Sequence, residues 1–274
     1  MQGRVRQHLE AAGVQVPAIL EQDLAQGFLL LSDLGTVLYL DVLTEDNFAE
    51  LYDDALLALA KIQDGADARG LPPYDEALLR REMMLFSDWL VGRHLQIELT
   101  PAQQDAMEQV HTLLVASALA QPRVFVHRDY HSRNLMVCPG NNPGILDFQD
   151  AVAGPVTYDL VSLLKDCYIK WPRARIKNRA LAFLRRSHGA RAIDEGQYLR
   201  WFDLMGVQRH LKASGIFARL YHRDHKAGYL KDIPRTLSYI QDLGADYPEL
   251  DPLVTLIGEQ VLPGLKGTAS SCTP

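Results

Sequence analysis

The sequence predicts an α+β fold that is mainly helical, with short strands near the N-terminus and in the middle of the chain. Over most of the chain, apolar residues recur at spacings of three and four, as on one face of a helix. Short apolar runs bounded by turn-forming residues occur at 14–35 and 123–151. The 274 residues are 47% hydrophobic and 23% charged, which is typical of a globular protein with one large domain or two small ones.

The N-terminal part combines one helix with a predicted hairpin. Residues 4–12 predict a short helix that ends at Gly13. "VQVPAIL" and "GFLLLSDLG" predict two strands on either side of the turn-like "EQDLAQG". From Phe48 to Ile62 the apolar spacing changes to three and four, so we expect an amphipathic helix that packs into the core.

The central part contains two further helices and one β-like stretch. Residues 74–95 repeat the helical pattern. The next helix is expected over 100–120, with Thr100 as the N-cap and Pro101 at the first helical position. The stretch 123–151, "RVFVHRDYHSRNLMVCPGNNPGILDFQDA", predicts short strands, and helices resume from Val156 to the end.

Composition argues against several classes of protein. The formal net charge of −6 disfavours a nucleic-acid partner, because such proteins usually carry a basic face. Cys138, Cys167 and Cys272 have neither zinc-site nor disulfide-framework spacing, which indicates a reducing compartment. No stretch reaches the roughly 18 uninterrupted apolar residues of a membrane span. We therefore expect a cytoplasmic protein with neither a nucleic-acid nor a membrane partner, and its oligomeric state stays open.

The stretch "FVHRDYHSRNLMV" interrupts an apolar run with several ionisable and hydrogen-bonding groups. Leu135–Val137 and Ile145–Asp147 flank the turn formers "CPGNNPG" and should pair as a hairpin. Its open end would bring Asn134 beside Asp147. One carboxylate and one amide oxygen at one point suit Mg²⁺. Asp129 precedes the same hairpin and could accept the proton of an attacking hydroxyl beside a metal-phosphate site.

Other interpretations of these residues stay open. His127, Asp129 and His131 form H-x-D-x-H, which could supply imidazole ligands to a metallohydrolase, although Asn134 and Asp147 would then have no role. The polar side chains could also do no more than cap the backbone of a loop. His127 alone is expected to be structural.

"HRDYHSRN" followed by "DFQD" resembles the H-x-D-x-x-x-x-N plus D pattern of protein-kinase-like folds, and the sequence contains no A-P-E segment. The chain is similar to the aminoglycoside phosphotransferase family of small-molecule kinases. This resemblance implies a two-lobed protein-kinase-like fold with a mainly helical C-lobe, and phosphoryl transfer from ATP with Mg²⁺. The resemblance also implies that Asp129 is the catalytic base and that Asn134 and Asp147 are the metal ligands. His127 and Asp159 would support the catalytic loop. Adenine would be bound by the backbone of a hinge formed by Leu31, Ser32, Asp33 and Leu34.

The sequence departs from this family at its N-terminal end. The resemblance implies a phosphate-covering loop and a lysine paired with a helix glutamate, but residues 1–28 contain no glycine-rich strand pair, and the first lysine is Lys61. We expect residues 1–34 to be a remnant of the N-terminal nucleotide-binding lobe with the hinge, and 35–274 to be the helical catalytic and substrate-binding lobe. We also expect exposed apolar surface near the remnant, and weak or absent activity, because phosphate positioning is lost.

The acceptor is predicted from long similar stretches. "DCYIKWP" (166–172) and residues 202–230 are similar to amino-sugar kinases of this family. The implied reaction is phosphorylation of a small-molecule amino sugar, at the anomeric hydroxyl of N-acetylmuramate or N-acetylglucosamine. The alternatives are an aminoglycoside, choline or homoserine acceptor, or a catalytically silent kinase-like binding module.

Basic and aromatic residues supply candidates for acceptor binding. Arg133 is one, and Arg209 lies in a basic run that could receive a carboxylate, although such runs are usually solvated helix faces. Cys167, Tyr168 and Trp171 could border a sugar ring or belong to the core.

Overall fold

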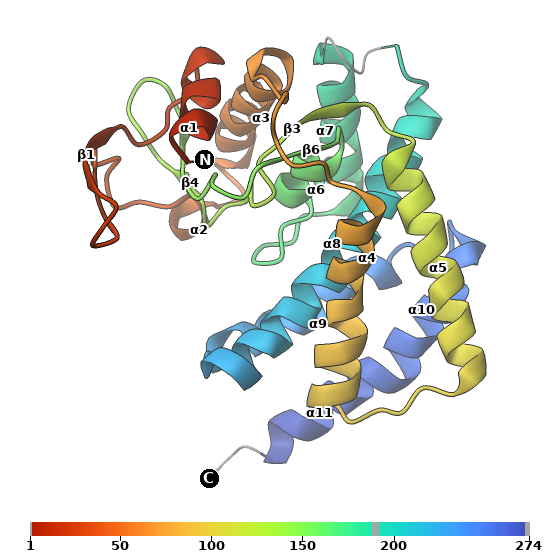
Figure 1. The fold of residues 1–274 in the computed structure, drawn as a ribbon. Helices are drawn as coiled ribbons and strands as arrows, with labels where there is room; N and C mark the ends of the chain where they lie inside the picture. Colours follow the sequence, from red (N-terminus) through yellow and green to blue (C-terminus); the bar gives the residue numbers. More distant parts are fainter. Residues whose placement is uncertain (1, 188–191, 272–274) are drawn as a thin grey trace. The chain divides into compact units, whose positions relative to one another are not determined.

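The computed structural model describes residues 2–187 and 192–271, which form two compact units (Figure 1). The first unit comprises Met1–Pro73, Pro122–Leu164 and Arg173–Tyr198, and the second comprises Tyr74–Gln121, Lys165–Pro172 and Leu199–Pro274. This division does not coincide with residue 34, because the N-terminal helix packs on a helix beyond the hinge. A lobe boundary at residue 34 therefore stays a prediction. Cys272 lies outside the described residues.

The first unit combines helices with three two-stranded antiparallel sheets, which pair β1 with β2, β3 with β6 and β4 with β5. Its elements are α1 (Gln2–Ala11), β1 (Ile19–Asp23), β2 (Phe28–Leu31), α2 (Tyr39–Val42), α3 (Phe48–Gly65), β3 (Arg123–Val126), β4 (Leu135–Met136), β5 (Gly144–Ile145), β6 (Val152–Pro155), α6 (Tyr158–Leu164) and α7 (Arg173–Arg186). The predicted mixture of helices and short strands is confirmed.

Helix α3 is central to the core of the first unit. Its predicted apolar stripe is buried from Phe48 to Ile62. The helix packs against α1, β3, α6 and α7. The amphipathic helix predicted from the spacing of three and four is therefore confirmed, and it supports the strand that leads into the candidate site.

The predicted N-terminal hairpin is confirmed in β1 and β2, where Asp23 lies opposite Phe28. Its first strand begins at Ile19, later than the predicted apolar run. Val14 and Val16 are buried instead, and Gln15 forms a parallel bridge to Gly144 of β5. The start of the apolar run thus packs on the β4–β5 hairpin and leaves β1 short.

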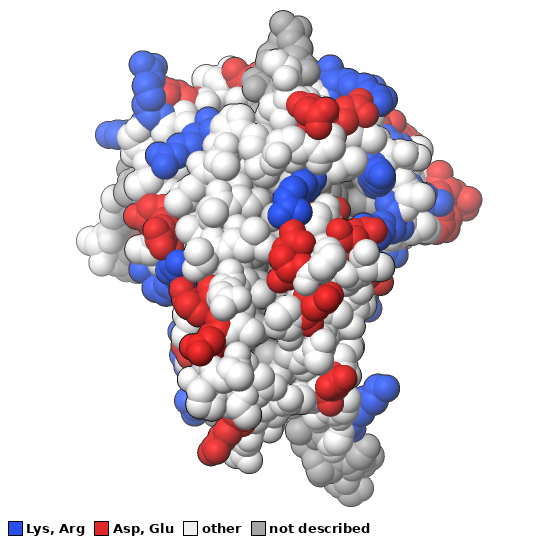
Figure 2. All heavy atoms as spheres, turned by 90° about the vertical axis from the view of Figure 1, so that its right-hand side faces the viewer, with Lys and Arg blue, Asp and Glu red and all other residues white. Residues whose placement is uncertain are grey.

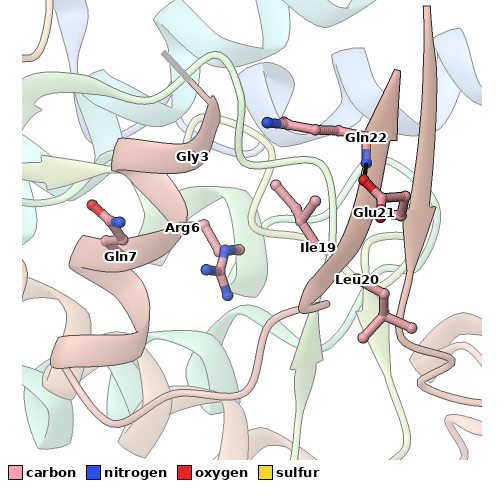
Figure 3. Close-up of a pocket in the computed structure, with 7 residues that line it drawn as sticks. All are labelled: Gly3, Arg6, Gln7, Ile19, Leu20, Glu21 and Gln22. Carbon is pink, nitrogen blue, oxygen red and sulfur yellow. Dashed lines mark hydrogen bonds between the residues drawn. The ribbon is translucent and has the colours of Figure 1, made fainter. Parts of the chain in front are cut away.

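The β1–β2 hairpin has the exposed apolar side chains that the sequence predicts. Leu24 is 74% exposed, Phe28 67% and Leu30 60%. A hollow of about 340 Å³ separates α1 from β1, and the side chains of Arg6 and Ile19 extend into it (Figure 3). None of the predicted catalytic or metal-binding residues lines this hollow.

The described part of the second unit is helical (Figure 1). Its elements are α4 (Glu76–Leu85), the π-helical η1 (Phe86–His94), α5 (Pro101–Leu119), α8 (Glu195–Asp224, which begins in the first unit), η2 (Ala227–Asp232), α9 (Ile233–Gln241), η3 (Pro248–Leu250), α10 (Asp251–Leu256), η4 (Ile257–Val261) and α11 (Leu262–Ser271). At α5, Thr100 and Gln103 form a capping box and Pro101 is the first helical residue, as predicted.

Charges of both signs are interspersed on the face shown in Figure 2. A single-sign basic field of the kind that nucleic-acid binders use is not seen on that face. Among the described helices, none is long and apolar enough to cross a membrane.

The segment predicted as one helix over 74–95 changes to a π-helix at Phe86, where it crosses α8. A Cβ atom on Gly215 of α8 would lie 2.2 Å from the carbonyl carbon of Leu85 and 2.3 Å from its oxygen. Because both atoms belong to the backbone, they cannot move aside as a flexible side chain could. Glycine is therefore required at this helix crossing.

We predict that Gly215→Ala destabilises the protein by about 3 kcal/mol, because the added methyl overlaps backbone at a packed crossing. Urea unfolding followed by circular dichroism measures the change. Gly267→Ala is the matched control, since an added Cβ meets nothing within 4 Å there and should change stability by less than about 1 kcal/mol. Equal stability of the two variants would contradict the packing argument.

Candidate active site

The β4–β5 hairpin brings Asn134 and Asp147 to the same end of two paired strands. Leu135 pairs with Ile145 and Met136 with Gly144, which confirms the predicted hairpin. Beyond the strands, the Leu146 N–H donates to the Asn134 carbonyl at 2.9 Å. Asp147 follows Leu146 directly, so it leaves the hairpin next to Asn134.

The loop before β4 adds Asp129 to this pair. The Asn134 side-chain amide donates from Nδ2 to the Asp129 carbonyl at 3.0 Å, and the Asn134 N–H donates to the His131 carbonyl at 2.9 Å. Asp129 and Asn134 are half-buried, and Asp147 is exposed. The structure thus brings the three predicted residues into one accessible region of the first unit.

Asp159 fixes the start of this loop from the first turn of α6. Its buried carboxylate accepts the His127 N–H at 2.6 Å and the Arg128 N–H at 3.0 Å. Arg128 has a φ of 78°, in the left-handed region that costs a non-glycine residue on the order of 1 kcal/mol. The two hydrogen bonds hold the chain in this conformation where it leaves β3.

Two further contacts fix the far side of the loop. The buried Tyr130 hydroxyl donates to the Ala55 carbonyl of α3 at 2.7 Å, and the Leu40 N–H of α2 donates to the Ser132 carbonyl at 3.1 Å. The backbone that carries Asp129 is therefore held by α2, α3 and α6.

His127 is fully buried, and its imidazole accepts a hydrogen bond from the backbone of the same loop. Its Nδ1 accepts the Asp129 N–H at 3.3 Å, so a proton on the neutral ring must sit on Nε2. Burial lowers the pKa of His127 to about 4, so the ring stays neutral near pH 7. The described residues contain no group of three or more His, Cys, Asp or Glu that could hold a metal ion.

The chemistry of the remaining donors fits Mg²⁺. The Asn134 Nδ2 is used toward Asp129, so the amide oxygen is the atom that can bind a cation. Asp147 has a φ of 62°, and its Oδ1 accepts a hydrogen bond from Gln149. One carboxylate and one amide oxygen are a suitable protein share of a Mg²⁺ shell, because this ion keeps several water or phosphate ligands.

The predicted hinge follows β2 and lies against the β4–β5 hairpin. The Ser32 N–H donates to the Ala18 carbonyl at 2.8 Å, so this N–H is already used within the protein. The Cys138 thiol donates to the Leu34 carbonyl at 3.4 Å. A Cβ on Gly144 would lie 2.9 Å from Leu34 Cδ1, so glycine permits this close contact. The adenine role of Leu31, Ser32, Asp33 and Leu34 stays a prediction.

The two candidate acceptor-binding arginines lie in different units. Arg133 is half-buried in the loop of the first unit. Arg209, on α8 in the second unit, is 5% exposed and donates from Nη1 to Cys167 Sγ at 3.4 Å. His210 and Lys212 are also buried. The solvated-face interpretation is therefore wrong for this half of the basic run, whereas Arg223, His225 and Lys226 are exposed.

Sequence analysis missed a buried polar network in the second unit. Glu82 of α4 accepts hydrogen bonds from Tyr74 and Gln208 and pairs with Lys212, whose Nζ lies 3.2 Å from Glu82 Oε1. In the same unit, Lys165 pairs with Asp203 at 2.6 Å. The position of Glu82 was the available signal, because it interrupts an apolar stripe that includes Leu79, Met83 and Phe86.

We predict that stability falls as pH falls from about 6.5 to about 4, because unfolded His127 gains a proton that the folded state excludes. Its folded-state pKa of about 4 is below the ordinary value of 6.5, so between these values the unfolded state binds more protons. This group alone should cost about 2 kcal/mol between pH 7.5 and 5.

The measurement is urea unfolding at both pH values for the wild type and for His127→Asn, whose Oδ1 can still accept the Asp129 N–H. The variant should lose less stability on acidification. The same pH dependence in both proteins would contradict a buried neutral His127.

Comparisons with known proteins identify the family of the chain. Residues 1–199 match the model of the phosphotransferase enzyme family. The chain is 50% identical over 254 residues to the N-acetylmuramate/N-acetylglucosamine kinase of Pseudomonas putida KT2440, a match that covers 92% of this chain and 75% of that protein.

Solved structures show the same fold. The Plasmodium vivax ethanolamine kinase has a TM-score of 0.62 at 12% identity, with 86% of this chain and 71% of that chain covered. The ADP-bound aminoglycoside phosphotransferase APH(2″)-Ib has a TM-score of 0.55 at 17% identity, with 87% and 81% covered. The predicted protein-kinase-like fold is thereby confirmed, and the chain belongs to the phosphotransferase enzyme family.

Proposed function

We propose that this phosphotransferase transfers the γ-phosphoryl group of ATP to a hydroxyl of an amino sugar, specifically the anomeric hydroxyl of N-acetylmuramate or N-acetylglucosamine. The observation that carries the proposal is the pair of hydrogen bonds made by Asn134, to Leu146 and to Asp129, which gathers Asp129, Asn134 and Asp147. The relative from P. putida supports the choice of acceptor, because its name states both sugars.

In the proposed reaction, Asp129 accepts the proton of the attacking sugar hydroxyl. Asn134 and Asp147 would hold Mg²⁺, which when bound neutralises charge on the phosphates. His127 and Asp159 keep the loop in place, since the His127 imidazole accepts the Asp129 N–H and the Asp159 carboxylate accepts the two preceding N–H groups. A loop fixed before the substrates arrive lowers the entropic cost of reaching the reactive geometry.

The nucleotide would lie with its adenine at the hinge, against the backbone of Leu31, Ser32, Asp33 and Leu34. Cytoplasmic ATP fits the thiols of Cys138 and Cys167, which are buried and not joined in a disulfide.

The assay of the proposed function is Mg²⁺- and ATP-dependent ADP release with N-acetylmuramate, N-acetylglucosamine and kanamycin in parallel. Release with the amino sugars above the level with kanamycin is expected. Release with kanamycin alone would show that the acceptor is an aminoglycoside and not one of the two amino sugars. ATP binding without release for any acceptor would favour a silent binding module.

We predict that Asp129→Asn abolishes sugar-dependent ADP release and changes ATP affinity by no more than about threefold, because a general base acts in the transition state and not in nucleotide binding. Isothermal titration with ATP and Mg²⁺ measures the affinity. Asp53→Asn is the matched control, since Asp53 pairs with Arg179 on the surface of the same unit. Loss of ATP binding by folded Asp129→Asn would contradict the assigned role.

A further inference from the structure

Three aromatic rings from separate segments form a cluster in the second unit. Tyr168 lies in the segment between α6 and α7, Phe217 on α8 and Tyr229 in η2. The Phe217 ring centroid lies 6.0 Å from that of Tyr168 and 5.6 Å from that of Tyr229. Phe217 is buried, whereas Tyr168 and Tyr229 are half-exposed. We call these three residues the aromatic platform.

The segment that carries Tyr168 is fixed by side chains from α8 and α9, which bind its backbone carbonyls. His210 Nε2 donates to the Lys165 carbonyl at 2.9 Å, and Arg235 Nη1 donates to the Cys167 carbonyl at 3.2 Å. The Tyr239 hydroxyl lies 3.3 Å from the Asp166 carbonyl and 3.1 Å from that of Ile169. These bonds hold residues 165–169 in one conformation.

The same contacts are insensitive to pH near neutrality. His210 stacks on Tyr239 with ring centroids 4.7 Å apart and planes at 6°. Burial lowers the pKa of His210 to about 3. The ring is therefore neutral, and its Nε2–H can donate to a carbonyl oxygen over the whole physiological range. The side chains that hold the segment around Tyr168 therefore keep the same charge across this pH range.

We propose that the aromatic platform binds the ring of the sugar acceptor, with Tyr168 and Tyr229 as the contacting residues and Phe217 as their support. The inference rests on the proposed function and names its acceptor-binding residues. A pyranose has an apolar face of C–H groups that packs on aromatic rings, and a rim of hydroxyls that tyrosine hydroxyls can hydrogen-bond.

The two tyrosines of the platform are accessible from outside. Phe217 is buried, whereas both tyrosines keep surface open to solvent, so a ligand can reach the tyrosines. The fixed backbone of 165–169 adds to the argument, because a rigid ring loses little entropy when a ligand binds. His210, Arg235 and Tyr239 are positioning residues in this account, since they act through the segment that carries Tyr168.

The test measures binding of N-acetylglucosamine and N-acetylmuramate without nucleotide, by saturation-transfer NMR and titration calorimetry. Tyr168→Ala and Tyr229→Ala should each weaken sugar binding about five- to tenfold, the range expected for loss of one aromatic contact. ATP affinity and the circular dichroism spectrum should not change. Tyr168→Phe should retain most of the affinity, because the ring is kept.

Tyr247→Ala is the matched control. Tyr247 is also half-buried in the second unit, but its hydroxyl donates to Asp203 at 2.9 Å. Asp203 precedes Phe217 by 14 residues on α8, which is about 21 Å along a helix. This variant should bind sugar like the wild type.

The outcomes separate the platform from the reaction. Unchanged sugar affinity in both platform variants, the same loss in Tyr247→Ala, or a wild type that binds neither sugar would overturn the platform. Sugar binding that the platform variants lose, in a protein that releases no ADP, would support the platform and contradict the proposed reaction. ADP release by the wild type, together with unchanged sugar affinity in both platform variants, would support the proposed reaction and overturn the platform.

Discussion

The candidate site depends on one buried carboxylate, that of Asp159, which accepts the backbone N–H groups of His127 and Arg128. A hydrogen bond to a charged group contributes about 1.5–3 kcal/mol, and burial of the carboxylate without these donors would cost more. The bonds stabilise Arg128 in its left-handed conformation. That conformation sets the direction in which the chain leaves β3, and so the position from which Asp129 and Asn134 follow.

The two units use buried polar groups in different ways. In the first unit, side chains bind backbone groups of the 127–134 loop and leave Asp129 and Asp147 accessible. In the second unit, ion pairs such as Glu82–Lys212 lie between helices. Buried pairs of this kind add little net stability compared with apolar packing, but loss of one partner is strongly destabilising because it leaves an uncompensated buried charge. In the first unit, the hydrogen bonds to the loop favour the fixed geometry that phosphoryl transfer requires.

Local patterns predicted much of the fold and part of the site. Thr100 with Pro101 marked the start of α5, and the turn residues after Met136 marked the β4–β5 hairpin, which in turn placed Asn134 beside Asp147. These features are set by residues close together in sequence. The contact between Asp159 and the loop was expected from family resemblance, and no local pattern indicated it.

The features that the sequence did not reveal arise from distant contacts. The π-helix over Phe86–His94 begins where Gly215 crosses the chain, a contact that periodicity cannot show. Strand β3 pairs with β6 and not with its sequence neighbour. Lys212 is buried because Glu82, far away in sequence, is its partner. In each case tertiary packing overrode a local preference.

The most direct test of the central claim is hydrogen–deuterium exchange of the amides of His127 and Arg128 in the wild type and in Asp159→Ala, with ADP release measured on the same samples. We predict slow exchange at both amides in the wild type. In the variant, exchange should be fast there and unchanged in α3, and ADP release should be lost. Equally slow exchange with full activity in Asp159→Ala would show that other contacts hold the loop, and would contradict this account.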